Sequence, residues 1–201
     1  MTAHVAFLRG VNLGKRTVKS VELQAAFGKL GYAGARTLIA SGNVVFDARP
    51  AKTLAAKLEA GLEAHFGFPI AVILRTQDEM RAIVASGPFA KVKLTETARP
   101  HGILFAGARP DVPLASVAGD YDIVRADPRE LYLVAWVQPR GGLGRGVTKL
   151  LDALNKQSVS TARAWNTLVK CEGSAVGAIP EAVPPAGHCR AGDSPKRDTR
   201  T

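Results

Sequence analysis

The sequence predicts an α+β protein built from two ferredoxin-like halves and followed by a disordered C-terminal tail. Short apolar strands alternate with helical patterns in the order β-α-β-β-α-β over residues 3–75, which is typical of the split βαβ motif. The following hundred or so residues repeat that order imperfectly. Pro, Gly and mixed charge dominate the last stretch. We therefore expect a ferredoxin-like half at 1–75, a second, imperfect ferredoxin-like half at 76–173 that packs with it, and a disordered tail at 174–201.

The first half contains four strands and two helices, recognised by their hydrophobic periods and by the turn residues that flank them. The expected elements are a strand at 4–9, a helix with its N-cap at Ser20 and its end at Gly31, strands at 36–40 and 44–46, a helix opened by Pro50 and a strand at 70–74. Crossover connections join parallel strands, so the third strand returns antiparallel between the first two. The loop at 9–19 and the turn at 41–43 then lie at the same end of the sheet and should converge.

The second half shows a related order of elements. The expected elements are a helix capped by Thr76 and Glu79, a strand at 101–106, a short helix within 110–119, a hairpin of strands at 121–125 and 131–137, a helix over Val147–Leu154, an edge strand at 158–160 and a last helix capped by Thr161. This order favours two similar halves that share one sheet. The sequence itself shows no internal repeat.

Positive charge is concentrated near the N-terminus. The net charge is +10, and residues 1–50 hold seven basic and two acidic residues. Such a patch favours polyanions, including nucleic acid and phosphorylated ligands. A surface that is basic only for solubility explains the same charge, because charge patterning is weak evidence of function.

The composition also bears on the compartment. No run approaches the roughly 20 apolar residues of a membrane span, so no membrane partner is expected. The first residues lead straight into a strand, which predicts no signal peptide. The two cysteines, Cys171 and Cys189, do not make a disulfide framework. We expect a cytoplasmic location, with Cys171 as a packing residue.

The loop at 9–19 does not match a nucleotide-binding motif. A P-loop needs four residues between its glycines, whereas Gly10 and Gly14 have three, and Arg16 separates Lys15 from Thr17. An anion site at the N-terminus of the following helix stays open, as does a solvated connection whose glycines only turn the chain. The histidines are isolated and no nucleophile elbow occurs, so we expect no metal and no cofactor and assign no catalytic residue.

The segment Thr161–Thr167 groups Arg, Trp, Asn and two Thr within seven residues. Arg163 either points into a site or caps the end of a strand. Trp165 and Leu168 have the spacing of residues that pack on a sheet, so the segment is also explained as an aromatic anchor for the last helix.

Three segments together resemble the bacterial domain-of-unknown-function family 1697. They are Ala6–Gly14 (AFLRGVNLG), Ser41–Phe46 (SGNVVF) and Thr161–Thr167 (TARAWNT). The resemblance covers roughly residues 3–172 and implies an α+β fold with ferredoxin-like halves, but no established activity. The third segment departs from the family pattern Thr-x-Arg-Asn-Trp, because Ala164 stands where the family has Asn.

These observations predict a cationic, polar cleft that binds an anionic, phosphate-bearing ligand, with nucleic acid as the first choice. The expected ligand-binding residues are Arg9, Asn12, Lys15, Arg16, Lys19, Ser41, Asn43, Arg163 and Asn166. RNA-binding sheets present stacking aromatics, and the strands offer Phe7, Phe46 and Phe105, which serve equally well as core. A small-molecule enzyme or sensor that uses the same cleft is the alternative, as is a structural or oligomerisation module.

Overall fold

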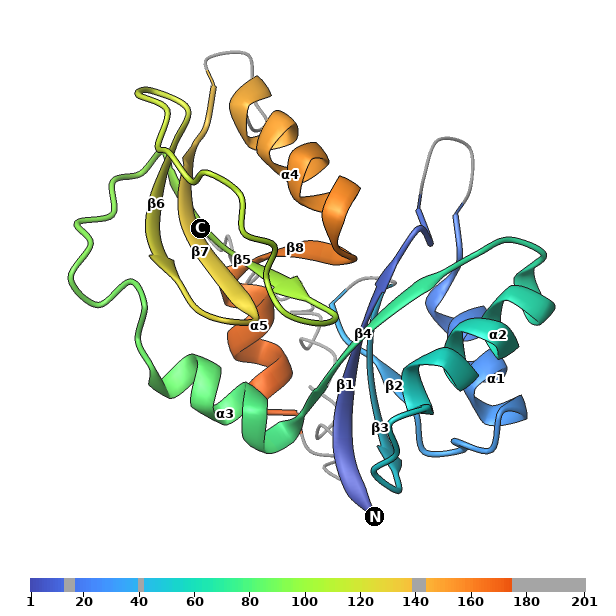
Figure 1. The fold of residues 1–201 in the computed structure, drawn as a ribbon. Coiled ribbons are helices and arrows are strands. Elements are labelled where there is room, and N and C mark those ends of the chain that lie inside the picture. Colours follow the sequence, from blue (N-terminus) through green and yellow to red (C-terminus); the bar gives the residue numbers. More distant parts are fainter. Residues whose placement is uncertain (13–16, 40–41, 139–143, 175–201) are drawn as a thin grey trace, which may run out of the picture.

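The fold is α+β. The computed structural model describes residues 1–12, 17–39, 42–138 and 144–174 of the 201 in the chain. Within these ranges it contains two four-stranded antiparallel sheets and five helices (Figure 1). Each half builds its own sheet, so the expectation of one shared sheet is wrong. None of the helices in the described ranges has the length and apolar character that a membrane crossing needs.

The first sheet has the strand order β2-β3-β1-β4. Its half consists of β1 (Thr2–Arg9), α1 (Ser20–Lys29), β2 (Arg36–Thr37), β3 (Asn43–Ala48), α2 (Leu54–Phe66) and β4 (Ala71–Thr76). Strand β3 lies between β1 and β2 and pairs antiparallel with both, as the order of elements predicts. The helices α1 and α2 cover one face of this sheet, where Leu23, Phe27 and Leu58 are fully buried.

Two local predictions in the first half need correction. Strand β2 is only two residues long, because Ile39 adopts a φ of 65°, a left-handed conformation that breaks the strand and that β-branched residues rarely adopt. Ser20 is the first residue of α1 rather than its N-cap. The N-cap is Lys19, whose backbone N–H donates to a carboxylate oxygen of Glu22 at 3.0 Å.

The second sheet has the strand order β6-β7-β5-β8. Its half consists of α3 (Gln77–Ala85), β5 (Ala98–Phe105), β6 (Tyr121–Ala126), β7 (Glu130–Trp136), α4 (Arg145–Gln157), β8 (Ser160–Ala164) and α5 (Trp165–Glu172). The hairpin β6–β7 and the helix α4 lie where the sequence predicts them. The capping box of α3 is confirmed: Thr76 Oγ1 accepts from the backbone N–H of Glu79, whose carboxylate accepts from the backbone N–H of Thr76.

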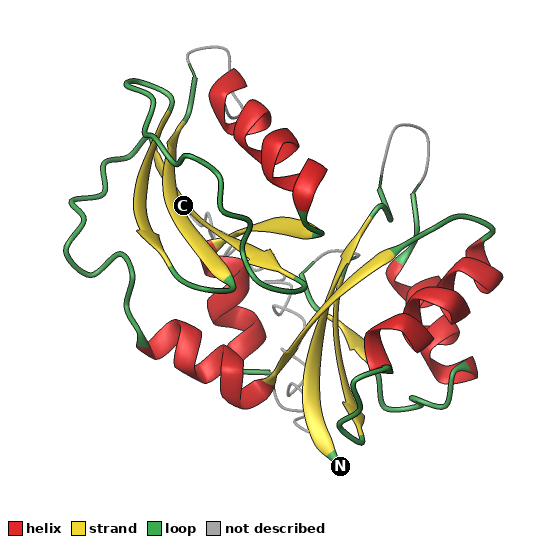
Figure 2. Ribbon diagram, viewed as in Figure 1, coloured by secondary structure: helices red, strands yellow, loops and turns green. Residues whose placement is uncertain are grey.

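Two elements of the second half differ from the prediction. Residues 107–120 form a loop without the expected short helix (Figure 2). Pro110 and Pro113 account for this, because proline disfavours the helical conformation in the residue before it. Thr161 is not a helix cap: it lies within β8, which pairs with β5, and α5 begins only at Trp165. The expected edge strand at 158–160 is therefore displaced toward the C-terminus.

A central core lies between the two sheets and joins the halves. Val5 and Phe7 of β1 and Tyr132 and Val134 of β7 are all buried in it. Helices α3 and α5 line the same core and contact each other at the base of the molecule (Figure 1). Burying one large apolar side chain stabilises a fold by roughly 1.5–3 kcal/mol. The halves are therefore fastened together by a shared core as well as by the polar contacts described next.

Candidate functional site

The loop after β1 and the turn before β3 meet at one end of the first sheet. The backbone N–H of Leu8 donates to the carbonyl of Gly42 at 2.7 Å, and Phe7 pairs with Asn43 in register. Gly42 has a φ of 117°, which residues with a Cβ rarely adopt. The predicted convergence of these two segments is confirmed.

Strand β8 of the second half closes this region into a cavity of about 240 Å³. We call it the β1–β8 cleft, and its lining residues are Leu8, Arg9, Gly10, Val11, Asn12, Thr161 and Arg163. Residues from both halves therefore form its walls. Thr161 is not among the residues that the sequence predicts for this site, because the pattern predicts it as a helix cap.

Arg163 lies at the base of this cleft and is held by a full set of hydrogen bonds. A guanidinium has five N–H donors. The five acceptors around it are Asn43 Oδ1 (2.8 Å), Thr161 Oγ1 (2.5 Å) and the carbonyl oxygens of Ala162 (2.9 Å), Leu8 (2.8 Å) and Gly42 (3.2 Å). Of the two roles open to Arg163, the structure shows the strand-end cap. With its donors used, it can act on a ligand only through its charge.

The other half carries the same arrangement in reverse. Arg75 on β4 donates to the carbonyl oxygens of Phe105 and Arg129, both at 3.0 Å, and to that of its neighbour Leu74 at 2.8 Å. Its Nε and Nη2 atoms also contact Glu130 Oε1, at 3.0 and 2.8 Å. Each half therefore extends one arginine into the strand ends of the other half. We call these contacts the two arginine clamps.

The strand registers place the two clamps at equivalent positions. Both central strands, β1 and β5, pair with their neighbours at matching points. Phe7 of β1 pairs with Asn43 and Ile73, and Leu104 of β5 pairs in the same way with Glu130 and Thr161. Two residues before each of these positions, Val5 pairs with Arg75 and Gly102 pairs with Arg163. The two halves are therefore related by an approximate internal two-fold repeat, which the sequence does not show.

The two clamps differ in charge. Glu130 neutralises Arg75, and these side chains are 13% and 1% exposed. The residue equivalent to Glu130 in the first half is Asn43, which is neutral. Among the described residues no carboxylate lies within ion-pair distance of Arg163. The β1–β8 cleft therefore contains a positive charge that the described part of the chain does not balance.

Burial affects both guanidinium groups. Desolvation lowers the pKa of Arg163, and a thiolate at Cys171 would act in the opposite direction. Desolvation also lowers the pKa of Arg75, against the attraction of Glu130. Arginine titrates so far above neutrality that both stay protonated at pH 7. The Arg163 guanidinium also lies 5.9 Å from the centre of the Phe7 ring, which adds a cation–π attraction.

Of the other residues predicted for this site, some are exposed around the loop, one is buried, and three lie outside the described ranges. Arg9 is exposed at the mouth of the cleft, and Asn12 accepts a hydrogen bond from the backbone N–H of Val18 at 3.2 Å, which closes the loop. Lys19 is exposed at the N-cap of α1. Asn43 is buried beneath the cleft, where its amide binds Arg163 and the carbonyl of Leu38. Lys15, Arg16 and Ser41 lie outside the described residues.

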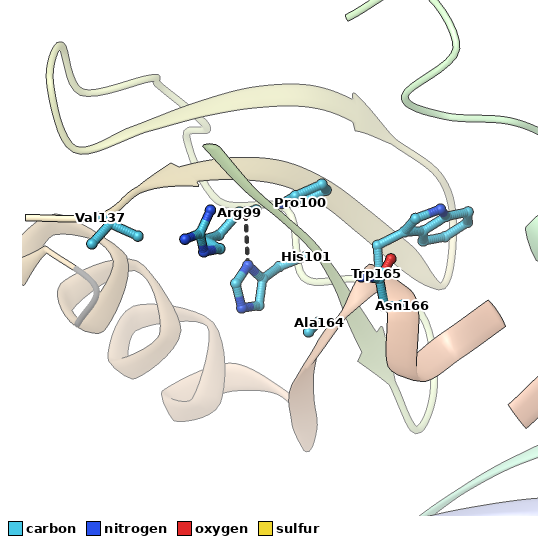
Figure 3. Close-up of a pocket in the computed structure, with 7 residues that line it drawn as sticks. All are labelled: Arg99, Pro100, His101, Val137, Ala164, Trp165 and Asn166. Atoms are coloured by element: carbon cyan, nitrogen blue, oxygen red, sulfur yellow. Dashed lines mark hydrogen bonds between the residues drawn. The ribbon is translucent and has the colours of Figure 1, made fainter. Parts of the chain in front are cut away.

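Asn166 lines a different cavity. That cavity, of about 370 Å³, lies beside the start of α5 and is also lined by Arg99 and His101 (Figure 3). Trp165 packs its ring on Phe89 and Tyr132, at centroid distances of 5.2 and 6.1 Å, so it is the predicted aromatic anchor. In the described ranges, no three His, Cys, Asp or Glu side chains gather closely enough to hold a metal ion.

The N-terminus of α4 is occupied by the protein itself. Asp120 Oδ2 accepts from the backbone N–H of Gly146 at 2.7 Å. A Cβ at Gly144 would lie 2.2 Å from this carboxylate, so the glycine makes room for it. The carboxylate of Asp120 therefore takes the place that an external anion would have at this helix end.

Comparison with known proteins identifies the family. The family model described as "Protein of unknown function (DUF1697)" matches residues 1–132. The chain belongs to the DUF1697 family. A search of curated proteins finds no match. Among solved structures, the conserved bacterial protein SP0830 from Streptococcus pneumoniae is similar, with a TM-score of 0.63 and 18% identity over 86% of this chain and 97% of that one. This likeness shows that the DUF1697 fold described above is shared, and it carries no information on activity.

Proposed function

We propose that the β1–β8 cleft binds the phosphate group of an anionic ligand. The unbalanced charge of Arg163 is the observation that carries this proposal. At the equivalent place in the other half, Glu130 supplies the counter-charge within the protein. In the cleft that charge is missing among the described residues, and a bound anion would supply it.

Exposed cations at the two ends of the segment 9–19 would complete the site. The side chain of Arg9 lines the cleft and makes no hydrogen bond or ion pair with another described residue, so its planar guanidinium is available for a phosphate. Lys19 adds a second exposed cation at the end of the same loop. Arg9 would contact the ligand directly, while Arg163 would attract it from below.

The aromatic residues restrict how a nucleic acid could bind. Phe7, Phe46 and Phe105 are all 0% exposed, so none of them offers a face for base stacking. Single-stranded nucleic acid binding depends largely on such stacking, at about 1–3 kcal/mol per base. We therefore propose that the cleft recognises the phosphate group, with a small phosphate-bearing molecule favoured over a nucleic acid strand.

Binding measurements with two probes test the proposal. Inorganic phosphate and a mixed-sequence single-stranded RNA are titrated into the full chain at about 50 mM salt, where phosphate contacts are strongest. Arg9→Ala should weaken phosphate binding by about tenfold, the loss expected for one charge-assisted contact of about 1.4 kcal/mol. Arg49→Ala is the matched control, because Arg49 is exposed in the same half but does not line the cleft.

The outcomes separate the ligand classes. Phosphate binding that is lost in Arg9→Ala and retained in Arg49→Ala supports the proposal. RNA binding with a steep salt dependence in addition to phosphate binding would restore the nucleic-acid prediction. Failure of the chain to bind either probe, or equal losses in the two variants, refutes the site.

A further inference from the structure

A second cavity lies beside the start of α5, away from the β1–β8 cleft. Its volume of about 370 Å³ falls in the range of small-molecule sites, roughly 300–1,000 Å³. Pro100 and Val137 give it an apolar wall, and Figure 3 shows the indole ring of Trp165 pointing away from the other labelled side chains. Arg99, His101 and Asn166 supply its polar groups. A mostly apolar hollow with a few polar side chains is the usual composition of a ligand pocket.

The internal repeat gives this α5 cavity a counterpart in the first half. His101 pairs with Ala164 in the second sheet as His4 pairs with Thr76 in the first. Both rings make the same local contact: His101 Nδ1 lies 2.8 Å from the carbonyl oxygen of Arg99, and His4 Nδ1 lies 2.7 Å from that of Thr2. The counterpart is a cavity of about 420 Å³ that His4 and Thr76 line.

A carboxylate occupies the counterpart. Glu79 Oε2 accepts from the backbone N–H of Thr76 at 2.7 Å, and Glu79 Oε1 accepts from Arg129 at 2.7 Å. The α5 cavity has none of these groups at the matching positions. Ala164 replaces Thr76 and Thr167 replaces Glu79, so no side chain hydrogen-bonds at the N-cap of α5.

We propose that the α5 cavity binds a small carboxylate with an apolar body. The carboxylate would take the place that corresponds to Glu79 in the counterpart cavity, beside His101 and Asn166 at the start of α5. Arg99 supplies the positive charge: its Nη1 donates to the carbonyls of Glu96 and Ala98, while its Nε and Nη2 atoms make no hydrogen bond to another described residue. The apolar body of the ligand packs against Pro100 and Val137.

Benzoate is a suitable probe, and benzamide is its uncharged control of the same shape. Millimolar benzoate is titrated into the full chain, and two-dimensional NMR follows the backbone signals of residues 164–168. Benzoate should give saturable shifts there and benzamide none. Arg99→Gln should reduce the benzoate affinity by about tenfold, the loss of one charge-assisted contact.

A transplant of the α3 cap onto α5 gives a second, independent test. The double variant Ala164→Thr and Thr167→Glu recreates the capping box of α3 and places a carboxylate of the protein in the α5 cavity. We expect it to raise the unfolding midpoint and to abolish the benzoate shifts. Arg9→Ala should leave benzoate binding unchanged, because Arg9 belongs to the other cleft.

These measurements test carboxylate binding in the α5 cavity independently of phosphate binding in the β1–β8 cleft. Selective benzoate binding that is lost in the transplant and weakened in Arg99→Gln supports a carboxylate site. The absence of saturable shifts, equal shifts with benzamide, or unchanged binding in a folded transplant overturns it. If the transplant does not fold, the exposed Arg99→Gln variant decides, and an affinity equal to that of the original chain refutes the proposal.

Discussion

Glutamine substitution of the two clamp arginines should destabilise the protein unequally. Arg75→Gln leaves the carboxylate of Glu130 largely buried without its partner, whereas Arg163→Gln leaves only neutral acceptors behind. Breaking a buried ion pair by removing one partner typically costs about 3–5 kcal/mol. The loss of Arg163 removes three hydrogen bonds between the halves, at about 1 kcal/mol each, so about 3 kcal/mol in total.

Urea unfolding followed by tryptophan fluorescence measures both losses. With an m-value of about 2 kcal/mol per M, a loss of 3 kcal/mol lowers the unfolding midpoint by about 1.5 M urea. The double variant Arg75→Gln and Glu130→Gln should recover part of the larger loss, because it removes the stranded charge. The explanation fails if Arg163→Gln costs less than about 1 kcal/mol, or if Glu130→Gln does not improve Arg75→Gln.

Three further predictions follow from the described contacts. Burial alone would raise the pKa of Glu79, but its hydrogen bond to the backbone of Thr76 and the charges of Arg129 and Arg75 outweigh burial and lower the pKa. The ionised Glu79 side chain therefore stabilises the fold above pH about 4.3, and this stabilisation is lost as the pH falls through the folded pKa. Glu79→Gln should therefore lower stability at pH 7 and flatten its decline toward pH 3 in urea unfolding. Gly144→Ala should cost about 1–3 kcal/mol alone and much less in an Asp120→Ala background, as a double-mutant cycle would measure. Burial raises the pKa of the Cys171 thiol to about 11, so the thiol is protonated and inaccessible at pH 8. In a Cys189→Ser background a thiol reagent should therefore label Cys171 only at the rate of unfolding, and fast labelling of the native chain would contradict this.

The elements that the sequence predicts well are those fixed by short-range patterns. Leu54, Leu58 and Leu62 repeat with the helical period and are all buried in α2. The capping box at Thr76 depends on residues only three apart. The meeting of the first loop with the Gly42 turn is predicted from topology alone, because the chain order requires β3 to return between β1 and β2.

The clamps could not be predicted, because their partners carry no sequence signal. Arg163 binds the carbonyl oxygens of Leu8 and Gly42, 155 and 121 residues away, and every residue has such an oxygen. Their equivalence is also hidden, because only the arginine is shared between Leu74-Arg75-Thr76 and Ala162-Arg163-Ala164. It emerges from the strand registers.

The sequence groups Asn166 with Arg163 because the predicted last helix contains both residues. Residues three apart on a helix share a face. Arg163 instead ends a strand, and the chain turns into α5 at Trp165. Asn166 consequently faces another cavity, and this single error in one element boundary accounts for the misplaced residue.

The reciprocal clamps have the form of an isologous contact, in which two copies of one surface bind each other. In a dimer of identical chains, one residue type must occupy both copies of every position. Joining the halves in one chain removes that requirement. Position 130 can then carry the acid that completes a rigid ion pair, while position 43 carries a neutral amide. One contact is thereby neutralised within the protein, whereas the other keeps a positive charge that no described carboxylate pairs with.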